Sequence, residues 1–257
     1  MPSLPRFARF ARFIFASILT STFAIASQAQ PQGPAKTVVL VHGAFADGSS
    51  WQKVIPLLGK AGLKVIAVQN PLDSLDNDVA FTNRALDLAE GPVVLVGHSW
   101  GGVVITQAGL HDKVKALVYV AAYAPDVGQS LVDTVKNYPE PSGQAFFVKD
   151  ANGYFKISDE GVYKHFAADL TPHEKELVAV TQGAFSSKAA ATPVTKAAWH
   201  TVPSFAVITA DDTINPPQMQ RDQAKRLNAK SVEIHSSHVA MLSHPDVVAK
   251  LIIDAAK

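Results

Sequence analysis

A short glycine-rich motif around Ser99 combines a nucleophile with the backbone freedom that an exposed nucleophile needs. The pentapeptide Gly97-His98-Ser99-Trp100-Gly101 follows the β-branched run 93–96 and precedes an apolar, helix-like segment. This pattern is typical of a nucleophile elbow, a sharp turn between a buried strand and a helix. The turn strains the serine, and side chains at positions 97 and 101 would collide with neighbouring backbone. The motif predicts a catalytic serine; the alternative is a glycine-rich turn with an incidental serine.

A serine hydroxyl is a weak nucleophile at neutral pH, so Ser99 needs a base, and the base needs a carboxylate that fixes its tautomer. Asp211 and Asp212 follow the predicted strand 205–209, and His238 follows the last predicted strand. Serine, acid and histidine, in this order and each just past a strand, form the expected arrangement around such an elbow. We predict Ser99, Asp212 and His238 as the catalytic residues, with Asp211 as the alternative acid.

The choice of His238 among nine histidines depends on its place in the chain. His238 alone occupies the loop after the last predicted strand, whereas His235 lies in that strand and His244 opens the last helix. His42 and His98 belong to the turns that flank the predicted site. No two histidines have the i, i+4 spacing of a helical zinc site, and cysteine is absent, so we predict no metal and no cofactor.

The oxyanion of the reaction requires two backbone N–H donors. One is expected from Trp100, the residue after the nucleophile, and the other from Ala44, in the loop after the first strand. The aromatic rings of Phe45 and Trp100 flank the expected site and are candidates for walls of a substrate pocket.

Alternating strands and helices must position these residues. Continuous β-branched runs predict strands buried on both faces of a parallel sheet, and amphipathic segments with caps predict the helices between them. The order along the chain predicts an α/β fold with a mostly parallel central sheet flanked by helices. The predicted strands are 37–41, 64–68, 93–97, 114–122, 205–209 and 231–235, and the predicted helices are 51–60, 78–89, 100–110, 216–227 and 245–256.

The alternation fails between the fourth and fifth strands. Residues 126–198 contain several prolines, a predicted hairpin at 146–157 and two helix-like segments at 159–168 and 172–183. We interpret 126–198, called the cap below, as an insertion folded over the sheet; a separate small domain is the alternative.

The N-terminal 29 residues differ from the rest of the chain. Three arginines precede an apolar stretch that ends in Ala26-Ser27-Gln28-Ala29, which is typical of a secretory signal peptide. Cleavage is expected after Ala29, with Ala26 as an alternative. The apolar run is about 14 residues long, against about 20 for a membrane span, so cleavage is favoured over a membrane anchor. We predict a periplasmic or secreted mature protein, 30–257, with one domain.

Composition excludes several other classes of protein. Apolar residues make up 47% and charged residues 18% of the chain, as in an ordinary globular protein. Removal of 1–29, with three arginines and no acid, changes the formal net charge from +1 to −2. A basic patch for nucleic acid is not expected, and the predicted partner is a small-molecule ester; the oligomeric state is not predicted.

Three motifs carry a resemblance to a known family. The segments 42–51 (HGAFADGSSW), 97–102 (GHSWGG) and 236–245 (SSHVAMLSHP) resemble a bacterial branch of the α/β-hydrolase superfamily, similar to plant methyl esterases and hydroxynitrile lyases. The resemblance implies an α/β-hydrolase fold with a cap inserted between strands. Its strand-to-acid spacing places the acid at Asp212, and a one-residue shift would choose Asp211. A tyrosine or leucine often stands where Trp100 does, so the tryptophan is expected to narrow the pocket.

These features favour a serine carboxylesterase that acts on small to medium apolar esters through an acyl-enzyme. A hydroxynitrile lyase is the first alternative, but Val239 stands where the plant lyases have a lysine that stabilises cyanide. A ligand-binding protein on the same fold is the second alternative, which tight binding with very slow turnover would favour.

Overall fold

Six parallel strands form the central sheet of the computed structural model, which describes residues 1–2 and 33–257. The predicted signal peptide lies outside the described residues, apart from residues 1 and 2. The strand order is β2-β1-β3-β4-β8-β9, and every neighbouring pair is parallel. The strands are β1 (Thr37–Val41), β2 (Lys64–Ala67), β3 (Val93–His98), β4 (Val114–Val120), β8 (Ser204–Thr209) and β9 (Lys230–Ile234).

The position of a strand in the sheet follows its composition. The continuous apolar runs of β1 and β3 are buried along their whole length, whereas the edge strands β2 and β9 carry exposed lysines. The register pairs Val41 with Gly97 and His98 with Val120. The loop after β1 and the turn after β3 therefore leave the same edge of the sheet side by side.

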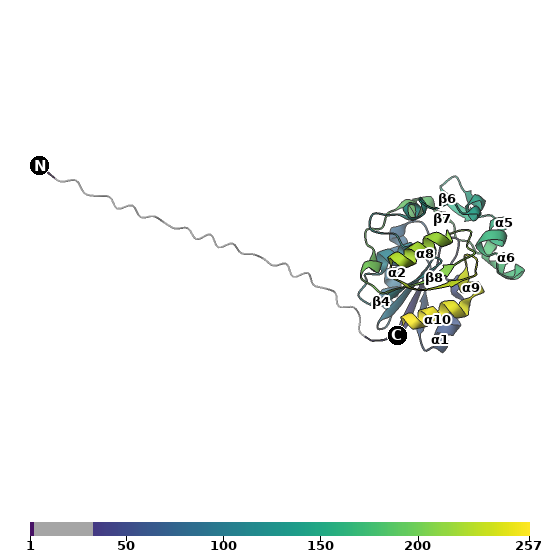
Figure 1. The fold of residues 1–257 in the computed structure, drawn as a ribbon, viewed down its shortest axis with the longest axis horizontal. Helices are drawn as coiled ribbons and strands as arrows, with labels where there is room; N and C mark the ends of the chain where they lie inside the picture. Colours follow the sequence, from purple (N-terminus) through teal and green to yellow (C-terminus); the bar gives the residue numbers. More distant parts are fainter. Residues whose placement is uncertain (3–32) are drawn as a thin grey trace.

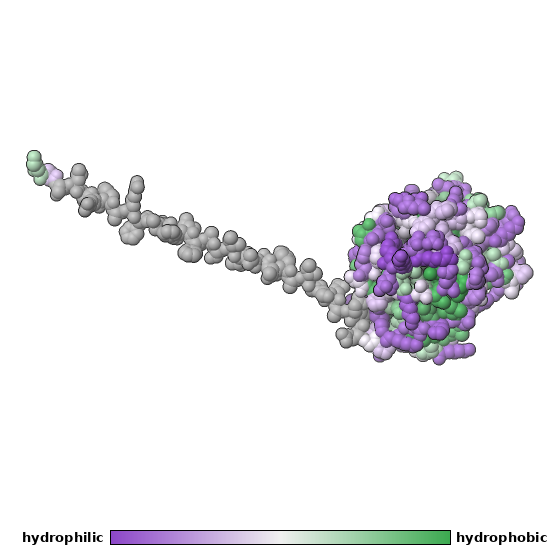
Figure 2. Space-filling model, viewed as in Figure 1, coloured by the Kyte–Doolittle hydropathy of each residue, from purple (hydrophilic) through white to green (hydrophobic). Residues whose placement is uncertain are grey.

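Helices cover both faces of the sheet (Figure 1). In that view the strands run between α8 on one side and the neighbouring α1 and α10 on the other. Hydrophilic residues cover α8 in Figure 2, in keeping with its Gln, Arg, Asp and Lys content. The helices are α1 (Ile55–Lys60), α2 (Leu75–Leu88), α3 (Trp100–Ala108), α8 (Pro217–Arg226), α9 (Ala240–Ser243) and α10 (Pro245–Ala255).

Two predicted helix starts were wrong. The segment 51–60 is divided into a 3-10 turn, η1 (Gly48–Trp51), and α1, and the side chain of Asp47 caps the turn by accepting from the Ser49 N–H. Helix α2 begins three residues earlier than predicted because the Ser74 hydroxyl accepts from the Asn77 N–H. Local capping by competing polar residues decided both starts.

The cap joins β4 to β8 and contains its own small sheet. The predicted hairpin is confirmed as β5 and β6, to which the unpredicted β7 adds a third antiparallel strand. Figure 1 shows β6, β7, α5 and α6 together on one side of the domain. No helix among residues 1–2 and 33–257 is long and apolar enough to cross a membrane. The cap elements are α4 (Leu131–Val135), η2 (Ser142–Phe146), β5 (Phe147–Lys149), β6 (Tyr154–Ile157), α5 (Asp159–Gly161), η3 (Val162–Phe166), α6 (Pro172–Val180), β7 (Phe185–Ser186), α7 (Ser187–Ala191) and η4 (Ala198–His200).

Candidate active site

Ser99 occupies a strained turn between β3 and α3. Its backbone has φ 51° and ψ −119°, a conformation that L-residues rarely adopt, and it is 6% exposed. A Cβ on Gly101 would lie 2.5 Å from the Val41 carbonyl oxygen, and a Cβ on Gly97 would clash with Gly101. The predicted strain and the need for glycine at both positions are confirmed. The packing around the turn maintains this conformation. The turn presents the Ser99 hydroxyl at the N-terminal end of α3.

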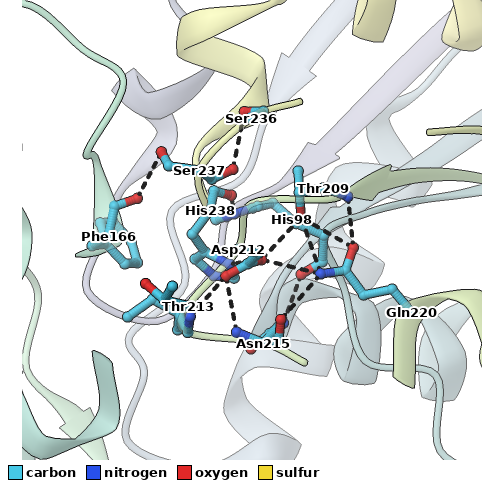
Figure 3. A network of polar contacts seen from close by, with 12 residues as sticks. His98, Phe166, Thr209, Asp212, Thr213, Asn215, Gln220, Ser236, Ser237 and His238 are labelled. Carbon is cyan, nitrogen blue, oxygen red and sulfur yellow. Dashed lines mark hydrogen bonds and ion pairs between the residues drawn. The ribbon is translucent and has the colours of Figure 1, made fainter. Parts of the chain in front are cut away.

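Asp212 and His238 form a buried pair near this turn. The Asp212 Oδ2 atom lies 2.8 Å from His238 Nδ1, and neither side chain is exposed (Figure 3). Asp211, the alternative acid, is 60% exposed and lies 3.2 Å from His235 on the surface. The structure therefore brings Asp212, and not its neighbour, to the predicted base.

Four further donors hold the Asp212 carboxylate. Oδ2 accepts from Thr209 Oγ1 at 2.9 Å and Gln220 Nε2 at 3.1 Å, and Oδ1 accepts from the N–H groups of Ile214 and Asn215. Figure 3 shows Thr209, Gln220 and Asn215 around the carboxylate, from β8, α8 and the loop between them. These donors fix the orientation of the carboxylate, and because its oxygens accept, Nδ1 of His238 is the donor.

The other nitrogen of His238 is free to accept a proton. Nε2 is buried and has no hydrogen-bond partner among the described residues. With Nδ1 donating to Asp212, the neutral imidazole carries its lone pair on Nε2, as a general base requires.

His98, beside Ser99 in the chain, holds the backbone of His238. Its Nε2 lies 2.9 Å from the His238 carbonyl oxygen, and the two rings are 4.8 Å apart. A carbonyl only accepts, so Nε2 of His98 carries the proton. Burial, together with the neighbouring His238, holds the pKa of His98 well below its ordinary value. A neutral His98 thus fixes the histidine loop against the elbow.

His42 orients the predicted oxyanion loop in a similar way. Its Nε2 accepts from the Asn70 N–H at 2.8 Å, so Nδ1 donates to the Gly43 carbonyl, also at 2.8 Å. Burial lowers the pKa of His42 and keeps this tautomer neutral. The peptide between Gly43 and Ala44 is trans, so the Ala44 N–H points away from the Gly43 carbonyl that His42 holds.

The two predicted oxyanion donors are both available. Among the described residues, no acceptor is found for the backbone N–H of Ala44 or Trp100. A Cβ on Gly43 would lie 2.8 Å from the Cβ of Ser99, so the Ala44 loop passes directly beside the elbow. The arrangement can place two N–H dipoles at an oxygen bonded to a carbon that Ser99 attacks.

The side chain of Trp100 has a partner that the sequence did not indicate. Its Nε1 donates to Asp78 Oδ2 at 2.6 Å, and its ring packs 4.9 Å from Phe185 of the cap. Burial raises the pKa of Asp78 to about 6, although N–H donors from Trp100 and Leu72 oppose this shift. The start of α3 is thus tied to α2 through a buried carboxylate, which the polar pattern of α2 did not distinguish from a surface acid.

The cap reaches the histidine loop through Asp169. Its Oδ2 accepts from Ser236 Oγ at 3.1 Å and from the Ser237 N–H at 3.0 Å, and its Oδ1 accepts from Ser237 Oγ. Burial acts to raise the pKa of Asp169, but these hydrogen bonds outweigh it and hold the pKa below its ordinary value. No local sequence pattern indicated this contact, because Asp169 and Ser236 lie 67 positions apart in the chain.

The sequence profile of the alpha/beta hydrolase family matches residues 38–251. The chain belongs to the alpha/beta hydrolase family. The match spans the elbow, the cap and the loops that carry Asp212 and His238, so the resemblance and the fold predicted from the sequence are confirmed.

Curated relatives of this hydrolase include several with esterase names. The alpha/beta hydrolase nvfD of Aspergillus novofumigatus is 28% identical over 241 residues, which are 85% of this chain and 96% of that protein. A carbendazim hydrolyzing esterase of Nocardioides sp. is 32% identical over 43% of this chain and 51% of its own length. Polyneuridine aldehyde esterase of Rauvolfia serpentina is 32% identical over 41% and 46%. The chain spans about half the length of these two esterases.

Solved structures share the fold of this hydrolase. Polyneuridine aldehyde esterase superposes with a TM-score of 0.76 at 23% identity, over 87% of this chain and all of that one. A pyrethroid hydrolase superposes with a TM-score of 0.74 at 24% identity, over 86% and 98%. Both proteins are less than 25% identical to this chain, so the likeness concerns the fold.

Proposed function

We propose that this protein is a serine carboxylesterase that acts on small to medium apolar esters. Ser99 attacks the ester carbonyl while His238 Nε2 takes its proton, and the N–H groups of Ala44 and Trp100 hold the oxyanion. The proton passes from His238 to the departing alcohol, which leaves an acyl-enzyme on Ser99. Water, activated by the same histidine, then releases the carboxylic acid.

One observation carries the proposal: the buried Asp212–His238 pair has an unpartnered Nε2, and His98 ties it to the elbow that bears Ser99. A free lone pair on Nε2, opposite the Nδ1 that donates to Asp212, is what a general base for Ser99 requires. The esterase names among the relatives support the same reaction class.

The test is hydrolysis of p-nitrophenyl butyrate by the purified wild type, Ser99→Ala and Ser231→Ala. Ser231 is an exposed residue of β9 and serves as the matched control. We expect Ser99→Ala to lose at least about 10⁴-fold in kcat and Ser231→Ala to remain unchanged. A fluorophosphonate probe should label Ser99 and no other residue by peptide mass spectrometry. Undiminished hydrolysis by Ser99→Ala would overturn the assignment.

We also propose that residues 1–29 are a secretory signal peptide that is cleaved near Ala29, which makes the mature enzyme periplasmic or secreted. The proposal depends on the arginine-rich start, the short apolar run and the small residues before Gln30. Peptide mass spectrometry of the protein from a bacterial periplasmic fraction should find the N-terminus at Gln30. Recovery of the intact N-terminus from washed membranes would contradict it.

A further inference from the structure

A groove opens between the η1 loop, the cap helix α6 and helix α9. Its cavity volume is about 140 Å³, which is room for one short arm of a small molecule and not for a whole drug-sized ligand. Its apolar walls come from both the core domain and the cap, and are Phe45, Phe166, Leu177, Val178, Val239 and Leu242.

Three walls of the groove adjoin the residues of the proposed reaction. Phe45 follows the oxyanion donor Ala44, and Val239 follows His238. The Phe166 ring lies 5.1 Å from the His238 ring, and Figure 3 shows it beside that histidine. The groove therefore lies one layer of side chains away from His238, although Ser99 and His238 do not line it.

The groove is lined by acidic side chains and by no basic ones. Its ionisable lining residues are Asp47 and Glu174, and no cationic side chain lines it. The nearby Lys53 forms an ion pair with Glu174, with its Nζ 2.5 Å from the carboxylate, and donates to the Leu242 carbonyl at 2.7 Å. A carboxylate in the groove would meet the negative Asp47 without a counter-charge and would lose its hydration.

We propose that this groove binds an uncharged apolar arm of the ester and discriminates against an arm that ends in a carboxylate. The inference rests on the proposed esterase function and names its substrate class. The apolar walls stabilise the neutral arm by burial, and the acidic rim supplies the discrimination.

Helix α6 offers a matched pair of positions for a test. Leu177 lines the groove and is 43% exposed, whereas Val180, 72% exposed on the same helix, does not line it. Leu177→Arg places a cation in the groove, and Val180→Arg places the same charge outside it. Thr181→Lys, at another exposed lining position, is a second groove variant.

The experiment compares kcat/KM for two pairs of esters that differ in a terminal carboxylate. In the acyl pair, p-nitrophenyl hexanoate is matched with mono-p-nitrophenyl glutarate; in the alcohol pair, hexyl acetate is matched with 6-acetoxyhexanoate. The wild type should prefer the neutral ester at least tenfold in one pair, which identifies the arm in the groove. Leu177→Arg and Thr181→Lys should reduce that preference at least tenfold, and Val180→Arg should change it less than twofold.

Hydrolysis of p-nitrophenyl acetate, whose acyl arm is too short to fill the groove, reports folding and the basic reaction. It should be similar in the wild type and Val180→Arg, and Ser99-dependent hydrolysis by the two groove variants shows that they are folded. If the groove variants match Val180→Arg in both pairs while hydrolysing the acetate normally, the groove proposal is wrong and the esterase function stands. If the wild type shows no Ser99-dependent hydrolysis of the acetate, the esterase function itself fails.

Discussion

Replacing Asp212 by asparagine keeps the shape of the side chain, removes its negative charge and exchanges one of the two acceptor oxygens for a donor NH₂ group. The carboxylate accepts from His238 on one oxygen and from the N–H groups of Ile214 and Asn215 on the other. An amide has one acceptor oxygen and one donor NH₂ group. In Asp212→Asn, either the histidine or the two backbone N–H groups must therefore face a donor.

The two orientations of the amide have different costs. If its oxygen stays on the backbone N–H groups, its NH₂ group forces His238 into the tautomer with a protonated Nε2, which cannot accept the serine proton. A comparable substitution lowers kcat by about 10⁴, or about 5 kcal/mol. If the amide turns over, two buried N–H groups lose their acceptor, at about 1–3 kcal/mol each. Oδ2 also accepts from Thr209 and Gln220, but the Thr209 hydroxyl can rotate to accept from the NH₂ group, and Gln220 Nε2 keeps its bonds to Thr209 Oγ1 and the Asn215 carbonyl. The two backbone N–H groups have no such alternative, so we expect the first orientation and the loss of activity.

The assay is kcat for p-nitrophenyl butyrate together with urea unfolding, which separates lost chemistry from lost folding. Asp211→Asn is the matched control, because Asp211 is exposed and its neighbour is the surface His235. We expect kcat of the control within twofold of the wild type. The reasoning is refuted if Asp212→Asn, folded as stably as the wild type, keeps kcat within tenfold, or if Asp211→Asn loses as much.

Two more predictions concern the contacts that hold the site from outside. The pKa of Asp78 rises from 3.8 to about 6 on folding, so the folded state binds its proton more tightly and stability falls as pH rises from about 4 to 6, by about 3 kcal/mol. Urea unfolding at pH 4 and pH 7 should show this loss in the wild type relative to Asp78→Asn, and equal pH dependence in both would contradict it. Asp169→Asn should lower kcat for p-nitrophenyl butyrate by about 10- to 100-fold with little change in KM, because it loosens the loop before His238. Asp159→Asn, an exposed change in the same cap, should have no effect, and equal kcat in both variants would show that the cap does not position the histidine.

The sequence alone determined the fold and the residue types of the candidate site. Ser99, Asp212 and His238 each follow a strand, and parallel strands end at one edge of a sheet, so periodicity was enough to place the three loops together. The strain at Ser99 was also predictable, because it depends on glycines within two residues of it. These inferences use local patterns that repeat in every βαβ unit.

Only the tertiary structure decided which side chains meet across the fold. Asp211 and Asp212 are adjacent and identical in type, and Asp212 is selected because Thr209 and Gln220 hold its carboxylate toward His238. The hydrogen bond between Trp100 and Asp78 joins residues 22 positions apart, and that between Ser237 and Asp169 joins residues 68 positions apart. Such contacts depend on the rotamer that packing leaves open to each side chain, and no local pattern encodes that choice.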